Sequence, residues 1–458
     1  MSNSPSATSS GSSESSSSFV PNFSFMTDAS YQQLVDDLSI IDDLDAVYGN
    51  YIDNEAFDKQ VADVARNVSF KHQSLVSFFR DESRYAKELS QFQDYYATQI
   101  QKWIDIPANR ASLAKRKVPE YKEHLQMFFD GMSMMHAAHT AFISDMEARL
   151  GMWGPTQLVS DIFTSLYLRI LAYKSFFDNY SQIIVMLDTL YKGPSFNKSI
   201  HACASEANQS IHPLLYYVRL PTTRSVTYSR IITQLLDYTE PSHPDYLGLV
   251  DIRHNLILLE KELHEKVNDC QSHLMVLECS RIIENCSVPV TIDRRLILRA
   301  TLIKVSLENP LLVNDTRTYV LYNDSLIFCK KVKNLRKERL QCKGVLDLVG
   351  ATLRPIPKSL VAQMTEARKP VLPAFFSKKL EEPQSPQIPV YGFELVVNDR
   401  NSDGPTSQNF SFAVDSLPTV NGTGVVYRRR HVVRTNTLSE QTLWIDKLVK
   451  VLQAVNSS

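Results

Sequence analysis

Glycine and short catalytic motifs are scarce in this sequence of 458 residues. Only 13 glycines are present, and no GxxxxGK[ST] loop, HExxH pair or GxSxG turn occurs. These absences exclude the usual signatures of phosphate-loop nucleotide hydrolysis, zinc proteolysis and serine hydrolysis. His136 and His139 are spaced like helix neighbours, but no second ligand pair accompanies them. We therefore expect no cofactor, no metal and no metabolic active site.

Long apolar runs and cysteine motifs are also missing. The best candidate run, Ile183 to Leu187, is too short to cross a bilayer, and the N-terminus has no basic-then-apolar signal pattern. The six cysteines form no CxxC pair, which favours reduced thiols packed as small apolar side chains. A formal net charge of −1 produces no field that would attract nucleic acid. The sequence therefore predicts a cytoplasmic protein without a nucleic-acid partner.

The N-terminal region divides into two segments. Residues 1–30 are rich in serine and poor in aliphatic residues, so they bury too little apolar surface to fold, and we expect a disordered tail. Residues 31–65 form an acidic amphipathic segment in which Leu34, Leu38 and Leu44 recur at helical spacing. This segment has two interpretations: an extra structural helix, or a regulatory one.

In the rest of the chain, the pattern of apolar residues changes near residue 286. Hydrophobic residues make up 43% of the sequence, enough to bury sizeable cores. Long helical periodicities with little glycine predict helices at about 72–100, 119–150, 156–190, 211–239 and 243–285. Short alternating stretches follow, and they predict strands at about 298–305, 318–330, 344–354, 392–397, 409–414 and 425–433.

One last helix is expected at the C-terminus. Thr437 and Glu440 form a capping box, and an apolar face follows with Leu443, Trp444, Leu448 and Leu452. A stretch rich in Pro, Lys, Glu and Ser near 357–389 predicts a disordered surface insertion. The predicted fold is an all-α elongated helical bundle over 66–285, then a small antiparallel β-barrel over 286–458 capped by this helix.

A family resemblance rests on several motifs in order. The segment Leu220–Tyr228 with Leu235-Leu236 and His243–Tyr246 resembles the third conserved region of Dbl-homology domains, and Ser77–Leu89 resembles the first. Val159–Phe163 resembles the second region. Beyond the bundle, Tyr319–Ile327, Gly344–Leu348 and Trp444 resemble strands and the helix of a pleckstrin-homology domain. The chain therefore resembles the tandem found in Dbl-family Rho exchange factors, over roughly residues 66–456.

This resemblance implies a function without covalent chemistry. Dbl-family proteins promote GDP release from Rho-family small GTPases, so the expected partner is such a GTPase, in its GDP-bound or nucleotide-free form. A catalytically weak or silent scaffold that binds GTPases or membranes is the alternative. A membrane-bending helical dimer is a third interpretation, which the mixed charges of the bundle disfavour.

Glu82 is the most informative candidate for GTPase binding. It interrupts an apolar stripe that runs from Leu75 to Tyr96 at steps of three and four residues. A carboxylate there needs a buried internal partner or a partner from another molecule, because an unpaired buried charge is costly. The pattern alone leaves both open. The resemblance implies the second, with Glu82 contacting switch I of the GTPase.

Three further residues are placed on the GTPase side by the resemblance. Asn268 corresponds to an asparagine that contacts the switch II side. Arg224, with Tyr228 one turn later, belongs to the conserved third region, where bundle packing is the preferred interpretation. Thr233 stands where the family commonly has a lysine, and a neutral threonine cannot make a charge-assisted contact.

The second region carries candidate phosphoinositide-binding residues. Lys304 and Arg317 occupy positions that are basic in lipid-binding family members, although Asp315 replaces another base, and Lys330 and Lys331 begin a basic loop. Such residues predict weak attraction to anionic phospholipids. This attraction would recruit the cytoplasmic protein to the inner face of the plasma membrane.

Overall fold

The computed structural model describes residues 54–115, 121–206, 211–224, 228–308, 310, 315–332, 339–366, 389–399, 419–421 and 424–457. The expected tail, residues 1–30, and the apolar positions Leu34, Leu38 and Leu44 lie outside the described residues. The end of the 31–65 segment is described, and it belongs to the first helix of the bundle.

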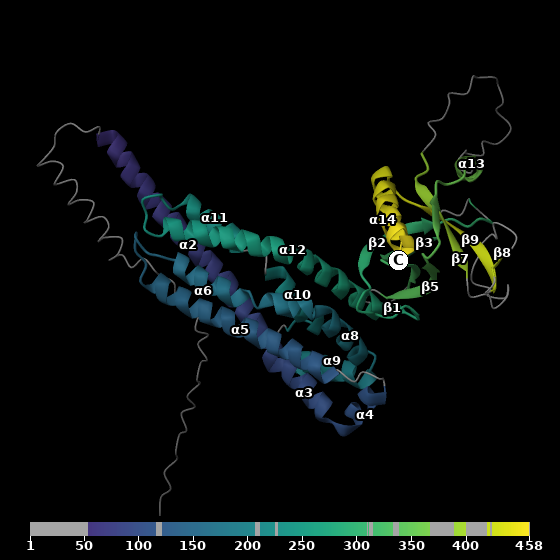
Figure 1. The fold of residues 1–458 in the computed structure, drawn as a ribbon, viewed down its shortest axis with the longest axis horizontal. Coiled ribbons are helices and arrows are strands. Elements are labelled where there is room, and N and C mark those ends of the chain that lie inside the picture. The colour runs from purple at the N-terminus through teal and green to yellow at the C-terminus, as the bar shows by residue number, and fades with distance from the viewer. Residues whose placement is uncertain are drawn as a thin grey trace, which may run out of the picture.

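Helices form an elongated body at one end of the molecule (Figure 1). Their bounds are α2 (Asn54–Gln91), η1 (Phe92–Ala97), α3 (Thr98–Asp105), α4 (Pro107–Lys115), α5 (Tyr121–Gly151), α6 (Ser160–Ile170), α7 (Tyr173–Asp178), α8 (Tyr180–Tyr191), α9 (Pro194–Glu206), α10 (Leu214–Arg224), α11 (Tyr228–Asp237) and α12 (Tyr246–Ile282).

The expected helix 72–100 is part of a longer one. It starts at Asn54 and continues through the π-helical turn η1 into α3. The stripe that predicted it is buried, and Phe92 and Tyr96 face the interior. The Tyr96 hydroxyl donates to the carbonyl of His212 at 2.8 Å, which ties the π-helical turn to the segment before α10.

The expected helix 156–190 is divided into α6, α7 and α8. The break between α7 and α8 is at Asn179, whose side-chain amide donates to the Ser175 carbonyl at 2.8 Å. An asparagine that bonds the preceding turn competes with the backbone ladder and favours such a break. The expected helix 211–239 is likewise divided into α10 and α11. Apolar periodicity alone predicts each of these groups of neighbouring helices as one helix.

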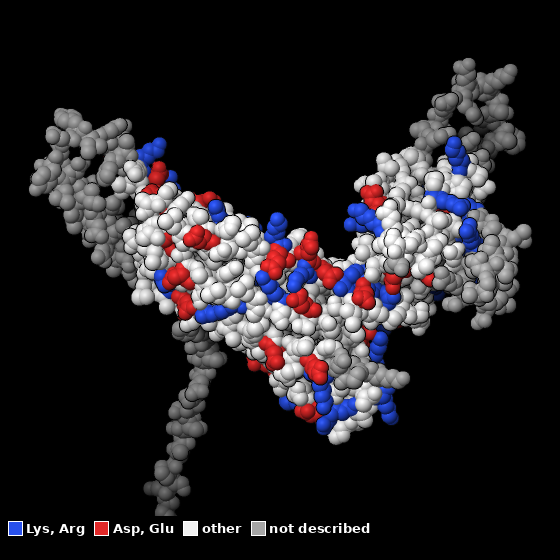
Figure 2. Space-filling model, in the orientation of Figure 1, with Lys and Arg blue, Asp and Glu red and all other residues white. Residues whose placement is uncertain are grey.

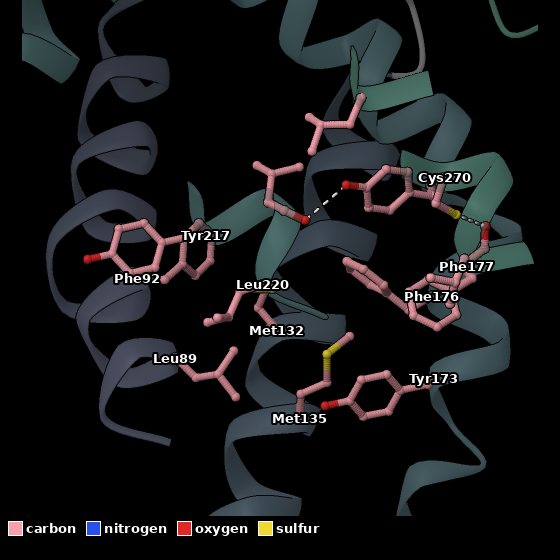
Figure 3. Packing of buried hydrophobic residues seen from close by; sticks show 14 of the residues in the cluster. Leu89, Phe92, Met132, Met135, Tyr173, Phe176, Phe177, Tyr217, Leu220 and Cys270 are labelled. Atoms are coloured by element: carbon pink, nitrogen blue, oxygen red, sulfur yellow. Dashed lines mark hydrogen bonds between the residues drawn. The ribbon is translucent and has the colours of Figure 1, made fainter. Parts of the chain in front are cut away.

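The core of the body is formed where α2, α5, α8, α10 and α12 meet. Figure 3 shows Leu89 and Phe92 facing Met132 and Met135 of α5, with Leu220 of α10 between them. The Tyr180 hydroxyl donates to the Val218 carbonyl at 2.9 Å, so this buried phenol has a hydrogen-bond partner. Each fully buried aliphatic or aromatic side chain contributes about 1.5–3 kcal/mol to folding.

A sheet-rich region follows the helical body. Its strands are β1 (Ile283–Glu284), β2 (Leu296–Lys304), β3 (Thr316–Tyr322), β4 (Ser325–Lys331), β5 (Leu340–Asp347), β6 (Thr352–Arg354), β7 (Gly392–Asp399), β8 (Thr419–Asn421) and β9 (Gly424–Arg434). They pair in the order β1-β5-β4-β3-β2-β9-β7-β6, with β8 beside β9. The expected strand at 409–414 lies outside the described residues.

The sheet differs from the expected small antiparallel barrel. Its pairs are antiparallel except that β1 pairs with β5 in parallel, so the sheet is mixed. Among the described strands, no pairing joins the two ends of the path, β1 and β6. The residues 283–284 already belong to the sheet, slightly before the expected boundary at 286.

Helix α14 (Leu438–Ser457) covers one face of the sheet. Its start is the expected capping box, because the Glu440 amide donates to the Thr437 hydroxyl at 3.1 Å. Trp444, Leu448 and Leu452 are buried against the sheet. Leu443 was expected on this face, but it is 45% exposed and lies on the solvent side.

The expected disordered insertion near 357–389 is partly ordered. Helix α13 (Lys358–Glu366) occupies its start. Leu360 and Met364 pack with Val305 and Val432 in a small separate apolar cluster. The turn from Pro357, whose carbonyl accepts from the Leu360 amide, begins this helix. The proline-rich composition hid a short amphipathic stretch, and residues 367–388 lie outside the described part of the chain.

Candidate functional site

Glu82 lies inside the helical body and has internal partners. Its carboxylate is fully buried, with an exposed fraction of 0%. One oxygen, Oε2, is 2.8 Å from Nδ1 of His139 in α5. The other, Oε1, accepts from Arg224 of α10, through Nε at 2.9 Å and through Nη2. The carboxylate that interrupts the α2 stripe is therefore satisfied within the chain.

Two tyrosines extend this network. The Tyr173 hydroxyl hydrogen-bonds Nε2 of His139 at 2.9 Å and the Tyr85 hydroxyl at 2.8 Å. Burial raises the pKa of both phenols, so they stay protonated. We call Glu82, Tyr85, His139, Tyr173 and Arg224 the Glu82 network. It joins α2, α5, α7 and α10 through polar contacts inside an apolar core.

Aromatic rings enclose the Arg224 guanidinium. Its central carbon lies 5.4 Å from the ring centre of Phe78, 5.7 Å from Tyr85 and 5.6 Å from Tyr228. Arg224 and Tyr228 thus pack within the bundle, as the preferred interpretation held. The aromatic faces and the carboxylate together offset the cost of desolvating this cation.

The electrostatics keep Glu82 ionised. Burial alone would raise the pKa of its carboxyl, but the contacts with His139 and Arg224 outweigh burial and hold the pKa below its ordinary value. In this structure the carboxylate is closed off from solvent by its own chain, and the implied contact of Glu82 with a GTPase stays a prediction. Of the two partners that the pattern left open, the structure shows the internal one.

Thr233 and Asn268 lie on a different surface, formed by α11 and α12. Thr233 is half-buried, and its hydroxyl donates to the Ser229 carbonyl at 2.8 Å. Beside it is a hollow of about 520 Å³. The hollow is lined by Thr233, Val250, Asp251, Arg253, His254, Asn255 and Ile257.

Asn268 is exposed on the same side of α12. It follows Val250 by eighteen residues, which is five turns of a helix, so both project from one face. Its amide nitrogen is 3.0 Å from Nε2 of His264, one turn earlier. Leu247 and Leu258 of the same helix are 73% and 53% exposed. We call this surface, from Leu247 to Asn268 with Thr233, the α12 face.

Residues 75–264 match the family model described as "RhoGEF domain". The helical body contains a RhoGEF domain. The match covers about two fifths of the chain and includes Glu82, Arg224 and Thr233. Asn268 lies four residues beyond its end, still within α12.

Curated relatives of the chain are distant and longer. The chain is 20% identical over 302 residues to Ras-specific guanine nucleotide-releasing factor 2 of Danio rerio, covering 63% of this chain and 24% of that protein. It is 22% identical over 272 residues to Rho guanine nucleotide exchange factor 4 of Homo sapiens, covering 59% of this chain and 37% of that protein. The chain thus spans about a quarter to two fifths of these relatives.

Solved structures with a similar arrangement include the DH/PH domains of p115-RhoGEF. That similarity has a TM-score of 0.42 and 13% identity, and it covers 85% of this chain and 98% of that one. The complex of PDZ-RhoGEF DH/PH domains with activated RhoA has a TM-score of 0.41 and 13% identity, covering 85% and 95%.

His139 is the residue of the RhoGEF domain that the sequence analysis missed. Its spacing from His136 indicates a metal pair, for which the sequence offers no second pair of ligands. A stronger signal was present, because His139 falls on the apolar stripe of α5 between Met135 and Phe142. A polar residue on the stripe of α5 and another on that of α2 predict each other as partners.

A second buried ion pair holds the far end of the RhoGEF domain. Asp245, in the His243–Tyr246 motif, lies 3.3 Å from Nζ of Lys71. Its two oxygens also accept from the amides of Val159 and Ser160, at 3.1 and 3.0 Å. Asp245 therefore caps the start of α6 while it pairs with α2. This motif is structural in this fold.

The four candidate lipid-binding residues lie at one end of the sheet. Leu302 pairs with Arg317, and Thr318 pairs with Cys329, so the end of β2, the start of β3 and the end of β4 are adjacent. Lys330 and Lys331 are exposed there. Arg317 forms an ion pair with Asp315, Nε to Oδ1 at 2.6 Å, which weakens the positive field.

Lys304 is close to this pair and to buried His431. Burial lowers the pKa of Lys304, and nearby Arg317 lowers it further. Burial, with Lys304 and Arg317, lowers the pKa of His431 to about 3, so the imidazole stays neutral. We call Lys304, Arg317, Lys330 and Lys331 the cationic end of the sheet.

Two features are absent from the described part of the chain. No group of histidine, cysteine or acidic side chains is arranged to hold a metal ion. No helix there is long and apolar enough to span a membrane. The visible face of the helical body mixes basic and acidic side chains, so it carries no continuous basic surface (Figure 2).

Proposed function

We propose that the chain is a guanine-nucleotide exchange factor that promotes GDP release from a Rho-family small GTPase. The observation that carries the proposal is the RhoGEF domain match, which runs from the middle of α2 to the middle of α12 and includes all of α11. The α12 face supports it, because an exposed apolar and polar surface of this kind fits a protein partner.

The proposed mechanism requires no covalent step and no cofactor of the exchange factor. The factor binds the nucleotide-free GTPase more tightly than the GDP-bound form, so binding shifts the population toward the state that has lost GDP. The α12 face, with Thr233 and Asn268, contacts the switch II side. GTP then binds the emptied GTPase and displaces the factor.

Glu82 fits this mechanism in one of two ways. A direct contact with switch I requires that the carboxylate leave Arg224 and His139. Both side chains would then lose their hydrogen-bond acceptor inside the core, which is costly. A positioning role requires no rearrangement, because the Glu82 network fixes α10 against α2 and so orients α11. The geometry favours the positioning role.

A silent scaffold is the second candidate function. It is favoured by two observations together: Glu82 is closed off by its own chain, and Thr233 supplies no positive charge. Such a protein would bind a GTPase through the α12 face without accelerating GDP release.

The test is the release of fluorescent GDP from a panel of Rho-family GTPases, alongside binding to their nucleotide-free forms. We expect accelerated release with at least one GTPase. Binding without acceleration across the panel would identify the scaffold, and neither binding nor acceleration would refute both.

The substitution Thr233→Lys refines this test. The added positive charge should raise the release rate or leave it unchanged, and Gln234→Lys, one position along α11, is the matched control for charge alone. A marked loss of exchange by well-folded Thr233→Lys would show that this surface recognises its GTPase in another way.

We also propose that the sheet-rich region is a pleckstrin-homology domain that binds anionic phospholipids weakly through its cationic end. The position of α14 on the sheet and the adjacency of Lys304, Arg317, Lys330 and Lys331 support this assignment. It would bring a cytoplasmic protein to the inner face of the plasma membrane.

A further inference from the structure

A second hollow lies where the helical body meets the sheet. It has a volume of about 630 Å³, and α8, α9, the end of α12 and the segment after β1 contribute to it. Figure 1 shows these elements converging beside β1. Cys286 lines this hollow, next to Asn285, whose backbone takes the left-handed conformation with φ of 57°. The chain turns there from β1 toward β2.

Cys286 is in contact with a cysteine of the sheet. Its thiol lies close enough to the thiol of Cys342 in β5 for each to shift the pKa of the other. The backbones explain this contact, because β1 pairs in parallel with β5, with Glu284 opposite Gln341. Cys342 is the next residue after Gln341 in β5, and Cys286 lies two residues after Glu284, just past the end of β1.

These two thiols differ from the others in exposure. All six cysteines are reduced, and Cys203, Cys270, Cys279 and Cys329 are buried. Cys286 and Cys342 are partly exposed. Cys329 also touches Cys342 from the neighbouring strand β4, but it has no exposed surface. The pair that a small oxidant reaches is therefore Cys286 with Cys342.

We propose that Cys286 and Cys342 are an oxidative modification site, at which a peroxide converts the thiol pair into a disulfide. The Cys286 thiolate attacks one peroxide oxygen, the O–O bond breaks, and hydroxide leaves as the sulfenic acid forms. The Cys342 thiolate then attacks the Cys286 sulfur and expels a second hydroxide. The two protons lost by the thiols convert both hydroxides to water. Two thiols are oxidised and one peroxide is reduced.

The environment makes this reaction slow at neutral pH. The neighbouring Cys342 thiol, with burial, raises the pKa of Cys286. The neighbouring Cys286 thiol lowers the pKa of Cys342, but contact with Cys329 and burial outweigh this effect, so the pKa of Cys342 is also raised. A raised pKa means a smaller thiolate fraction, so the rate should rise about tenfold per pH unit through the neutral range.

The disulfide would add a covalent cross-link between two segments that the β1–β5 pairing already holds side by side. Cys286 follows the end of α12, the helix that carries the α12 face, and Cys342 belongs to the sheet. A covalent link between them fixes the sheet to the end of that helix. The inference does not depend on GTPase binding, since the modification is a property of the chain alone.

The test is peptide mapping of the full chain after hydrogen peroxide treatment, with free thiols alkylated before tryptic digestion. The expected product links residues 282–294, which contain Cys286, to residues 340–343, which contain Cys342. It should disappear on reduction, form faster as the pH rises, and persist in the matched control Cys270→Ser.

Two variants test the order of steps. Cys286→Ser should yield no linked product, and Cys342→Ser should leave a sulfenic acid at Cys286 that dimedone traps. Both variants should keep the helical signal in circular dichroism. A product that links residues 318–330, which contain Cys329, to 340–343 would overturn the assignment. So would six free thiols after peroxide, or a linked product found only in unfolded protein.

Discussion

The helical body and the sheet differ in how their charged side chains are buried and paired. The body buries charged side chains in matched pairs, Glu82 with Arg224 and Asp245 with Lys71, and His139 also contacts Glu82. The cationic end of the sheet instead gathers four bases near one acid, Asp315, and leaves Lys330 and Lys331 exposed.

This difference separates architecture from recognition. A buried charge with internal partners orients helices, and it becomes costly only when one partner is removed. A cluster of like charges at a surface costs little and attracts an external anion. We therefore expect substitutions in the Glu82 network to act mainly on stability, and substitutions at the cationic end to act mainly on binding.

The largest expected effect is that of Glu82→Ala. It leaves Arg224 and His139 in the core without their acceptor, so the free energy of unfolding should fall by about 3–5 kcal/mol. Chemical denaturation monitored by circular dichroism measures this change. Asp81→Ala is the matched control, because Asp81 pairs with Arg84 at the surface and its loss should cost about 0–1 kcal/mol. Equal stability of the two variants would contradict the structural role of Glu82.

A smaller effect is expected from acid in the sheet region. His431 has a folded pKa of about 3 and an ordinary value of 6.5, so the unfolded chain takes up its proton first. Stability should therefore fall as pH drops from 6.5 toward 3, by roughly 2 kcal/mol between pH 7 and 5. His431→Gln should flatten this slope while keeping a polar partner for Tyr319. An unchanged slope in the variant would assign the acid sensitivity to other groups.

The smallest effect is expected at Lys330 and Lys331. Replacing either by glutamine removes a charge that adds on the order of 1 kcal/mol beside anionic lipid, so vesicle binding should weaken about fivefold. Sedimentation with phosphatidylserine vesicles measures it, with Lys102→Gln on distant α3 as the control. Thermal stability should not change. A fall in stability without a fall in vesicle binding would mean that these lysines stabilise the fold and do not bind lipid.

Much of the architecture was predictable from residue patterns. The order of a helical body and then strands, the final helix with its capping box, and the start of α12 near residue 243 follow from local periodicity and capping. The divisions at Asn179 and between α10 and α11 did not, because neighbouring helices share one apolar period. Helix α13 was hidden by the proline-rich composition around it.

The candidate site was predictable only in part. The interruption of the α2 stripe identified Glu82 as a residue that needs a partner. The identity of that partner depends on contacts between residues 57 and 142 positions apart, which no local pattern encodes. The GTPase contacts assigned to Glu82, Arg224, Thr233 and Asn268 and the lipid contacts at the cationic end stay predictions.

The apolar core that begins in the helical body does not end there. Val320, Ile327 and Leu340 of the sheet belong to the same continuous cluster as Leu277 near the end of α12 and Ile283 of β1. Regions that share a core gain their burial energy together, so neither half can lose its structure without exposing apolar surface on the other. The chain should therefore melt in a single cooperative transition, and the boundary near residue 285 is a change of secondary structure within one folding unit.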